Sequence, residues 1–304
     1  MSTDAILIEN VSKHYDSIVA VEDVSLSVAS GEVFGLIGHN GAGKSTLFKM
    51  MLGLVAPSSG HIRLHGTAVS GDQFREVRRR IAYLPENVVF YDNLTGLETL
   101  YFFADLKGAP RRECKPLLEK VGLTGAAKRK VGGYSKGMRQ RLGFAQALLG
   151  KPDILFLDEP TTGLDPEAIR SFYQLLHELK EQGVTAMLSS HSLAEIQERV
   201  DRLALMKLGR IQAVGTVSSL RRQLGLPIHF VVGLQGEGES ALRRLLDGYK
   251  EARLEVNGST ASVFCSIDQK LSLLSGLTSL HGVIDDIQVK EPSLEDVFLG
   301  YVDA

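Results

Sequence analysis

Residues 33–46, VFGLIGHNGAGKST, decide the fold of this 304-residue chain. Four of the first five residues are apolar and predict a short buried strand, the glycines break it, and the apolar-periodic run that follows, LFKMMLGL, predicts a helix. Strand, loop and helix together match the P-loop pattern GxxxxGK[ST], in which backbone N–H groups and a helix N-terminus bind phosphate. The residues expected to bind a nucleotide are Gly38, His39, Asn40, Gly41, Ala42, Gly43, Lys44, Ser45 and Thr46.

Two side chains of this loop have separate predicted tasks. Lys44 can reach the β- and γ-phosphates, and the hydroxyl of Ser45 can ligate Mg²⁺. A chance match to the pattern is the alternative, and it is disfavoured because the match lies between an expected strand and an expected helix.

Composition places the chain among ordinary soluble proteins, with 44% hydrophobic and 23% charged residues. Its length suits one large domain and a smaller one. A net charge of −2 gives no general attraction to nucleic acid or anionic lipid. Cys114 and Cys265 are far apart, which predicts two buried thiols in a reducing compartment. The N-terminus lacks a signal-peptide pattern and no apolar run approaches 18 residues, so we expect a cytosolic chain or one attached to a membrane through another protein.

A second candidate site segment is ILFLDEP (154–160), an apolar strand that ends in Asp158 and Glu159. Ligands bind at the carboxyl ends of strands in α/β sheets. Asp158 can therefore hold the Mg²⁺ that Ser45 contacts, and Glu159 can polarise an attacking water. His191 follows another expected strand and could contact the γ-phosphate, although a lone histidine is more often a packed or surface residue.

Several other segments have two interpretations. Tyr15 lies in the loop KHYDS between strands expected over 5–10 and 19–28, where it could stack on a base or pack half-buried. His61 and His65 have helical metal-ligand spacing, but they lie on an expected strand, where four residues span about 13 Å, and a metal site is rejected.

The middle and the end of the chain are expected to form further units. Residues 92–150 predict a helical insertion, with Thr95 and Ser135 as N-caps. A β-hairpin turns at Leu208–Gly209. The composition shifts near residues 225–227, and a small α+β domain with no recognisable chemistry follows, closed by a capped helix over 291–302.

In combination, these motifs resemble the ATP-binding-cassette (ABC) ATPases over about residues 5–220. GHNGAGKS matches the Walker A loop, ILFLDE the Walker B strand, and YSKGM the family's LSGGQ signature. GLD, which contains Asp165, matches the D-loop, His191 the switch histidine and Tyr15 the adenine-stacking aromatic. The resemblance implies an α/β P-loop NTPase cassette over 1–220, with a RecA-like core, an antiparallel β subdomain and a helical subdomain at about 92–150. The α+β accessory domain would occupy 221–304.

Two departures from the family pattern change the charge of the expected site. In the signature, Lys136 stands in place of the first glycine and Met138 in place of the glutamine, whereas Ser135 and Gly137 are kept. Glu86 stands where the family has the Q-loop glutamine. Since a carboxylate can accept a hydrogen bond or reach Mg²⁺ but cannot donate as an amide does, the expected metal residues are Ser45, Asp158 and Glu86.

The family mechanism implies a head-to-tail homodimer with two composite sites for ATP and Mg²⁺. Each site would combine one chain's Walker A loop with the other chain's Ser135, Lys136, Gly137 and Met138. The resemblance implies that Glu159 activates the water, that His191 holds the γ-phosphate, and that Lys44 and Mg²⁺ offset charge on the phosphoryl group.

The C-terminal PSLEDVFL and three longer stretches narrow the resemblance to ATPases of ABC-2-type exporters. IGHNGAGK, YLPENVVFYDNLTGLETL and YSKGMRQRLGFAQALLG are similar to the NosF-type ATPases, which support copper-site assembly in nitrous oxide reductase. This implies a NosY-like membrane permease, a periplasmic NosD-like protein, no nucleic-acid partner, and a peripheral location on the cytoplasmic face of the inner membrane. Another ABC-2 exporter, a soluble ABC ATPase of DNA repair or translation, and a non-hydrolysing regulatory module are the alternatives.

Overall fold

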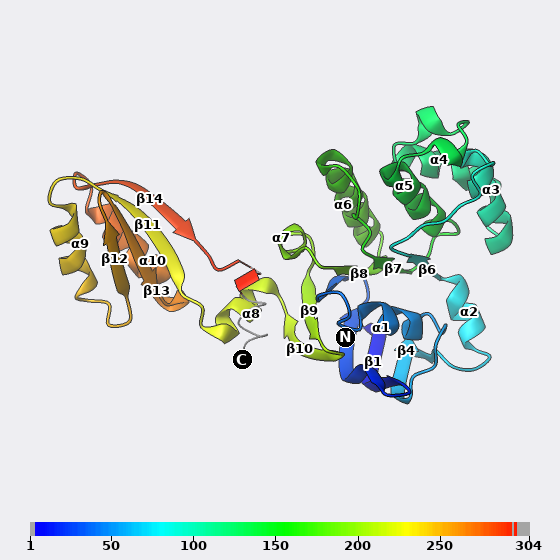
Figure 1. The fold of residues 1–304 in the computed structure, drawn as a ribbon, viewed down its shortest axis with the longest axis horizontal. Helices are drawn as coiled ribbons and strands as arrows, with labels where there is room; N and C mark the ends of the chain where they lie inside the picture. Colours follow the sequence, from blue (N-terminus) through cyan, green and yellow to red (C-terminus); the bar gives the residue numbers. More distant parts are fainter. Residues whose placement is uncertain (1–3, 294, 297–304) are drawn as a thin grey trace. The chain divides into compact units, whose positions relative to one another are not determined.

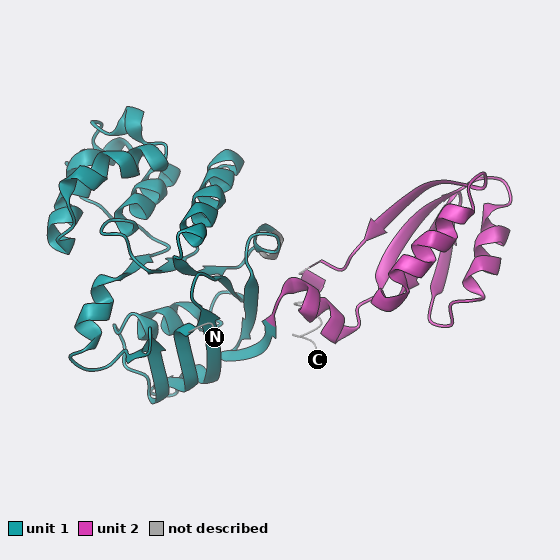
Figure 2. Ribbon diagram, turned by 180° about the vertical axis from the view of Figure 1, so that it is seen from behind, with its two compact units in different colours: residues 1–214 teal, residues 215–304 magenta. Residues whose placement is uncertain are grey.

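The computed structural model describes residues 4–293 and 295–296, which form parts of two compact units, 1–214 and 215–304 (Figure 2). The division falls a few residues before the boundary expected at 220. Most of the closing helix predicted over 291–302 lies outside the described residues.

A six-stranded sheet forms the centre of the first unit (Figure 1). Its order is β10-β9-β3-β8-β7-β6, and the neighbouring strands from β9 to β6 are parallel. The three middle strands are buried along their whole length, because helices or the second sheet cover both faces. The carboxyl ends of these parallel strands meet at one edge. The strands are β3 (Val33–Ile37), β6 (Ile81–Leu84), β7 (Ile154–Asp158), β8 (Thr185–Ser190), β9 (Arg202–Lys207) and β10 (Arg210–Gly215).

A second sheet, antiparallel in its pairings and ordered β2-β1-β4-β5, packs on the central sheet through α1 (Lys44–Met51). Phe48 of α1 meets Phe156 of β7 edge-on, with ring centroids 5.9 Å apart, inside a core shared by both sheets. Burying such a side chain contributes about 1.5–3 kcal/mol. The strands are β1 (Asp4–Tyr15), β2 (Ile18–Ala29), β4 (Ser59–Leu64) and β5 (Thr67–Ala68).

This second sheet corrects one expectation and supports another. Tyr15 is the last residue of β1, paired with Ile18 of β2, and not part of a longer loop. The turn is tight because Asp16 adopts a left-handed conformation, with φ of 46°. His61 lies on β4, as the sequence predicts, and His65 is the residue directly after that strand.

Helices α3, α4 and α5 lie between β6 and β7, where the sequence predicts a helical insertion, and they contact one another (Figure 1). Thr95 forms a full capping box with Glu98, and Ser135 caps α5, so both predicted N-caps are present. Asp165 caps the long helix α6, and Pro166 is its first residue. The helices are α2 (Phe74–Arg79), α3 (Gly96–Lys107), α4 (Cys114–Lys120), α5 (Lys136–Ala147), α6 (Pro166–Glu181) and α7 (Leu193–Ile196), with 3-10 turns at Arg111–Glu113, Thr124–Ala126 and Val131–Gly133.

The second unit contains an antiparallel sheet ordered β12-β13-β11-β14 with helices packed on one face. Its element order, strand-helix-strand-strand-helix-strand, is the split βαβ arrangement. Helix α8 (Val217–Leu224), which precedes it, was not expected from the sequence. The elements are β11 (Ile228–Leu234), α9 (Gly238–Leu246), β12 (Arg253–Asn257), β13 (Thr260–Cys265), a 3-10 turn (Ile267–Gln269), α10 (Lys270–Ser279) and β14 (Ile284–Lys290).

Two further expectations concern cysteines and membranes. Cys114 and Cys265 are free, buried thiols, and burial raises the pKa of each. In the described ranges, no helix combines the length and the apolar character needed to cross a bilayer.

Candidate functional site

The loop after β3 needs glycine at two positions for steric reasons. A Cβ on Gly38 would lie 2.4 Å from the carbonyl oxygen of Met206, and one on Gly43 would lie 2.5 Å from that of Ala20. Gly43 also has φ of 107°, a conformation that side chains strongly disfavour. It precedes α1 with no side-chain cap, so the first N–H groups of α1 remain available for an anion.

Lys44 is folded back onto its own loop. Its Nζ donates to the carbonyl oxygens of Gly38 at 2.5 Å and His39 at 3.2 Å, and lies 4.0 Å from Oε1 of Glu159. Burial lowers the pKa of Lys44, while the nearby carboxylates, Glu159 foremost, raise it. The site therefore holds an ammonium group whose charge an incoming phosphate would stabilise.

A cavity of about 260 Å³ brings the loop together with the acids that the sequence places near it. Glu86, Asp158 and Glu159 line it on one side, and β2 contributes Ile18, Val19 and Ala20. Tyr15 is outside this lining, is 41% exposed, and has the ammonium of Lys13 over its ring. The loop residues in the lining are Asn40, Gly41, Ala42, Gly43, Lys44, Ser45 and Thr46.

Asp158 is held in place by two hydroxyl groups. Ser189, fully buried at the end of β8, donates to its Oδ1 at 2.6 Å, and Tyr83 donates to its Oδ2 at 3.4 Å. The same Ser189 oxygen accepts the backbone N–H of Glu159 at 3.0 Å. Burial and the charge of Asp158 raise the pKa of Tyr83, so its hydroxyl stays a donor. These two hydroxyl groups orient the carboxylate, and Asp158 lines the cavity that Ser45 also lines.

The two carboxylate oxygens of Glu159 have different surroundings. Its Oε2 lies 2.8 Å from Nδ1 of His191, whereas Oε1 is buried and has no hydrogen-bond partner in the described part of the chain. The residue is only 7% exposed and has φ of 48°. A left-handed non-glycine residue costs about 1–3 kcal/mol and is typical of functional sites. One carboxylate oxygen is therefore oriented by His191, and the other is left for a water in the cavity.

The signature segment and the D-loop contact each other within one chain. Ser135 accepts the N–H of Met138 at 3.2 Å, and Asp165 accepts that of Ala168 at 2.8 Å, so each residue caps the helix it precedes. A Cβ on Gly137 would lie 3.1 Å from the carbonyl oxygen of Gly163. None of the described residues that line the nucleotide cavity comes from 134–138.

Comparisons with known proteins agree with this geometry. Residues 21–162 match the model of the ABC transporter family. Over 304 aligned residues, the chain is 34% identical to the linearmycin resistance ATP-binding protein LnrL of Bacillus subtilis, with 96% of each chain covered.

The chain belongs to the ABC transporter ATP-binding proteins.

Two further proteins are similar to this ABC protein. It is 37% identical, over 314 aligned residues, to the Nod factor export ATP-binding protein I of Burkholderia thailandensis, with 98% of this chain and 97% of the relative covered. The ATP-binding cassette MJ0796, solved as a post-hydrolysis dimer bound to ADP and Pi, has a TM-score of 0.64 to it at 26% identity. That match covers 70% of this chain and 98% of the other. The predicted cassette fold and ATPase class are confirmed.

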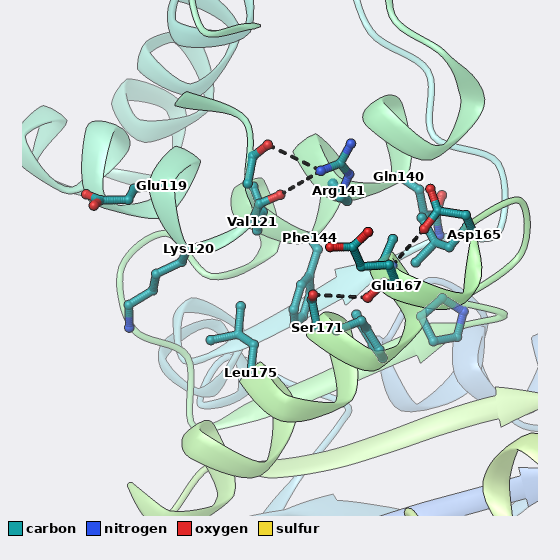
Figure 3. A pocket seen from close by; sticks show the side chains of 15 residues that line it. Glu119, Lys120, Val121, Gln140, Arg141, Phe144, Asp165, Glu167, Ser171 and Leu175 are labelled. Atoms are coloured by element: carbon teal, nitrogen blue, oxygen red, sulfur yellow. Dashed lines mark hydrogen bonds between the residues drawn. The ribbon is translucent and has the colours of Figure 1, made fainter. Parts of the chain in front are cut away.

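A second, larger cavity of about 470 Å³ lies between the helical subdomain and α6 of the ABC protein (Figure 3). Arg141 of α5 donates to the carbonyl oxygens of Val121 and Gly122, which ties the signature helix to the end of α4. Asp165 also lines this cavity, with its carboxylate engaged in the cap of α6.

Sequence reasoning missed three residues of the nucleotide site. Ser189 is a polar residue at the end of an otherwise apolar strand, and the pair Ser189–Ser190 in TAMLSS was a signal that could have been used. Ile18 is 66% exposed and Val19 is 47% exposed, although both are apolar and line the cavity. Exposed β-branched residues next to a P-loop offer an apolar surface for the flat face of a base.

Proposed function

We propose that this chain hydrolyses ATP as one half of a head-to-tail homodimer and thereby energises a membrane permease of the ABC-2 exporter type. The observation that carries the hydrolytic part is the buried Oε1 of Glu159 at the P-loop cavity, which accepts no hydrogen bond from the described residues. A carboxylate oxygen left without a donor in a buried site needs a hydrogen-bond donor, and the attacking water is one.

In this mechanism, Lys44 and the loop N–H groups bind the β- and γ-phosphates. Lys44 would exchange the carbonyl oxygens of Gly38 and His39 for phosphate oxygens, which are better acceptors for an ammonium group. His191 orients Glu159 and, with its side chain 59% exposed, can also reach a γ-phosphate held in the loop. Tyr15, Ile18 and Val19 provide aromatic and apolar surface for the adenine.

The residues at the cavity fit Mg²⁺. Mg²⁺ is commonly bound by one or two carboxylates together with substrate phosphates and water, so two protein carboxylates are enough to hold it. Asp158, the hydroxyl of Ser45 and Glu86 line one cavity, and the described residues contain no larger cluster of metal-ligating side chains. Bound there, the ion would neutralise charge on the phosphates.

The dimer is proposed because the nucleotide cavity and the signature segment lie in two separate places on each chain. Ser135, Lys136, Gly137 and Met138 do not line the chain's own cavity, so a second copy is needed to bring them to the nucleotide. The solved dimer of MJ0796 supports this arrangement for a cassette of the same fold.

The names of two relatives support an exporter. One relative is a linearmycin resistance protein and the other a Nod factor export protein, and both align over nearly their whole length. We place the chain on the cytoplasmic face of the cell membrane, attached through its permease. The narrower NosF-type role in copper-site maturation, with NosY-like and NosD-like partners, rests on the three resembling sequence stretches and not on these relatives.

The decisive experiment replaces Glu159 with Gln. Glu159→Gln keeps the shape of the side chain and its contact with His191 but removes the base, so we expect unchanged ATP affinity, a loss of turnover of about 10²–10⁴-fold, and an ATP-dependent dimer. The matched control is Glu167→Gln on α6, an acid outside the nucleotide cavity, for which parental turnover is expected. Parental hydrolysis by Glu159→Gln would contradict the assignment of the base.

A further inference from the structure

The two positions at which this chain departs in charge from the ABC pattern carry opposite charges. Glu86 adds a negative charge where the pattern has a neutral glutamine, and Lys136 adds a positive charge where the pattern has a glycine. Neither side chain has a hydrogen bond or salt bridge within the described part of the chain.

Glu86 leaves the nucleotide cavity with an excess of negative charge. Three carboxylates, those of Glu86, Asp158 and Glu159, act on the single buried ammonium group of Lys44, and each raises the pKa of Lys44. Asp158 accepts hydrogen bonds from hydroxyl groups, and Oε2 of Glu159 contacts His191. Glu86 is exposed at the cavity edge and has no cation of its own, and a bound triphosphate would increase the repulsion.

Lys136 is exposed and packs against the D-loop. A Cβ on Gly163 would lie 2.8 Å from Cδ of Lys136 and 3.1 Å from its Cγ and Cε, so the lysine stem crosses the space that the glycine leaves open. Gly163 has φ of 83° and lies four residues after Glu159. The contact fixes the direction of the stem, and the ammonium group projects from a surface made of the signature segment and the D-loop.

We propose that Lys136 pairs, across the dimer interface, with the partner's Glu86, a carboxylate that has no salt bridge to the described residues of its own chain. The inference rests on the proposed homodimer, in which the signature segment of one protomer covers the nucleotide cavity of the other. Lys136 is then a positioning residue: it favours closure of the ATP-bound dimer by pairing with the partner's Glu86 at the cavity edge. The pair replaces a neutral glutamine and a glycine at the same two places.

The test measures dimerisation of the full-length Glu159→Gln protein with Mg²⁺ and ATP by analytical ultracentrifugation. Lys136→Gln is expected to raise the dimer dissociation constant about tenfold at low ionic strength and clearly less at about 0.5 M salt, because charge pairs at interface edges are screened. Lys136→Arg keeps the charge and is expected to stay within about twofold of the parent. Lys115→Gln on α4, an exposed lysine of the same subdomain, controls for the change in net charge.

A double-mutant cycle separates the pair from a purely structural effect. In the Glu86→Gln background, Lys136→Gln should change the dissociation constant of the dimer by less than about twofold, because the carboxylate that Lys136 pairs with has been removed. ATP binding to the monomer should be the same in every variant at Lys136, since that residue does not line its own chain's cavity.

Three results would overturn the inference. One is a dimer unaffected by Lys136→Gln. Another is a tenfold loss that persists with Glu86→Gln, which would indicate a contact with the nucleotide's own phosphates. The third is a Glu159→Gln parent that binds ATP and stays monomeric, which would contradict the composite site itself and so is distinguishable from the first two.

Discussion

The hydroxyl of Ser189 offers the sharpest test of how Asp158, the proposed Mg²⁺ ligand, is held. Ser189→Ala removes one oxygen that is fully buried, donates to Asp158 at 2.6 Å and accepts from the N–H of Glu159 at 3.0 Å. A hydrogen bond to a charged group contributes about 1.5–3 kcal/mol, and a buried N–H left unpaired costs about 1–3 kcal/mol. We expect the free energy of unfolding to fall by about 3 kcal/mol.

The assay combines urea unfolding with steady-state ATP hydrolysis. A loss of about 3 kcal/mol corresponds to a decrease in Tm of about 6–12 °C for a unit of this size. Removing a residue that orients a metal ligand commonly costs about 10–100-fold in metal affinity or activity, so kcat at low Mg²⁺ should fall by that factor and recover in part when Mg²⁺ is raised. The stabilisation that Mg²⁺ and ATP add to the folded protein should shrink as well.

The control for Ser189→Ala lies at the other end of the same strand. Thr185 is also buried, and its hydroxyl accepts the N–H of Gly31 at 3.0 Å, far along β8 from the nucleotide cavity. Thr185→Val should cost about 1 kcal/mol, the contribution of a neutral hydrogen bond, and leave kcat and its Mg²⁺ dependence at the parental values. A Ser189→Ala protein with parental stability and parental kcat would refute the reasoning.

Three further predictions concern the loop and the helical subdomain. Gly43→Ala should lower ATP affinity at least tenfold in an equilibrium binding assay, because its Cβ would clash with the carbonyl oxygen of Ala20, whereas Gly71→Ala, with open space around it, should bind ATP normally. Thr95→Ala should destabilise α3 by about 1 kcal/mol, measured by hydrogen exchange. Hydrogen bonds from Thr95 lower the pKa of Glu98. The stability that the ionised carboxylate adds is therefore present at neutral pH and is lost as pH falls through the lowered pKa. Glu98→Gln should remove that pH dependence.

Features governed by neighbours in the chain were predictable from the sequence alone. The P-loop, the caps at Thr95, Ser135 and Asp165, and the acidic end of β7 all depend on residues within a few positions of one another. Short-range hydrogen bonds and strand or helix periodicity determine such features, so residue order is enough to identify them. The cassette and its small C-terminal domain follow from the order of these elements.

Contacts between distant segments were decided by the tertiary structure. Ser189 bonds to residues 30 and 31 positions away, and it does so because β8 lies beside β7 in the sheet. The stem of Lys136 crosses Gly163 only because α5 and the D-loop are packed together. Tyr15 was assigned to a loop because the sequence does not show that β1 continues to the turn. The order of the motifs indicates the reaction. The positions of the charged groups depend on how strands pair and helices pack, and these positions matter because charges interact through space and not along the chain.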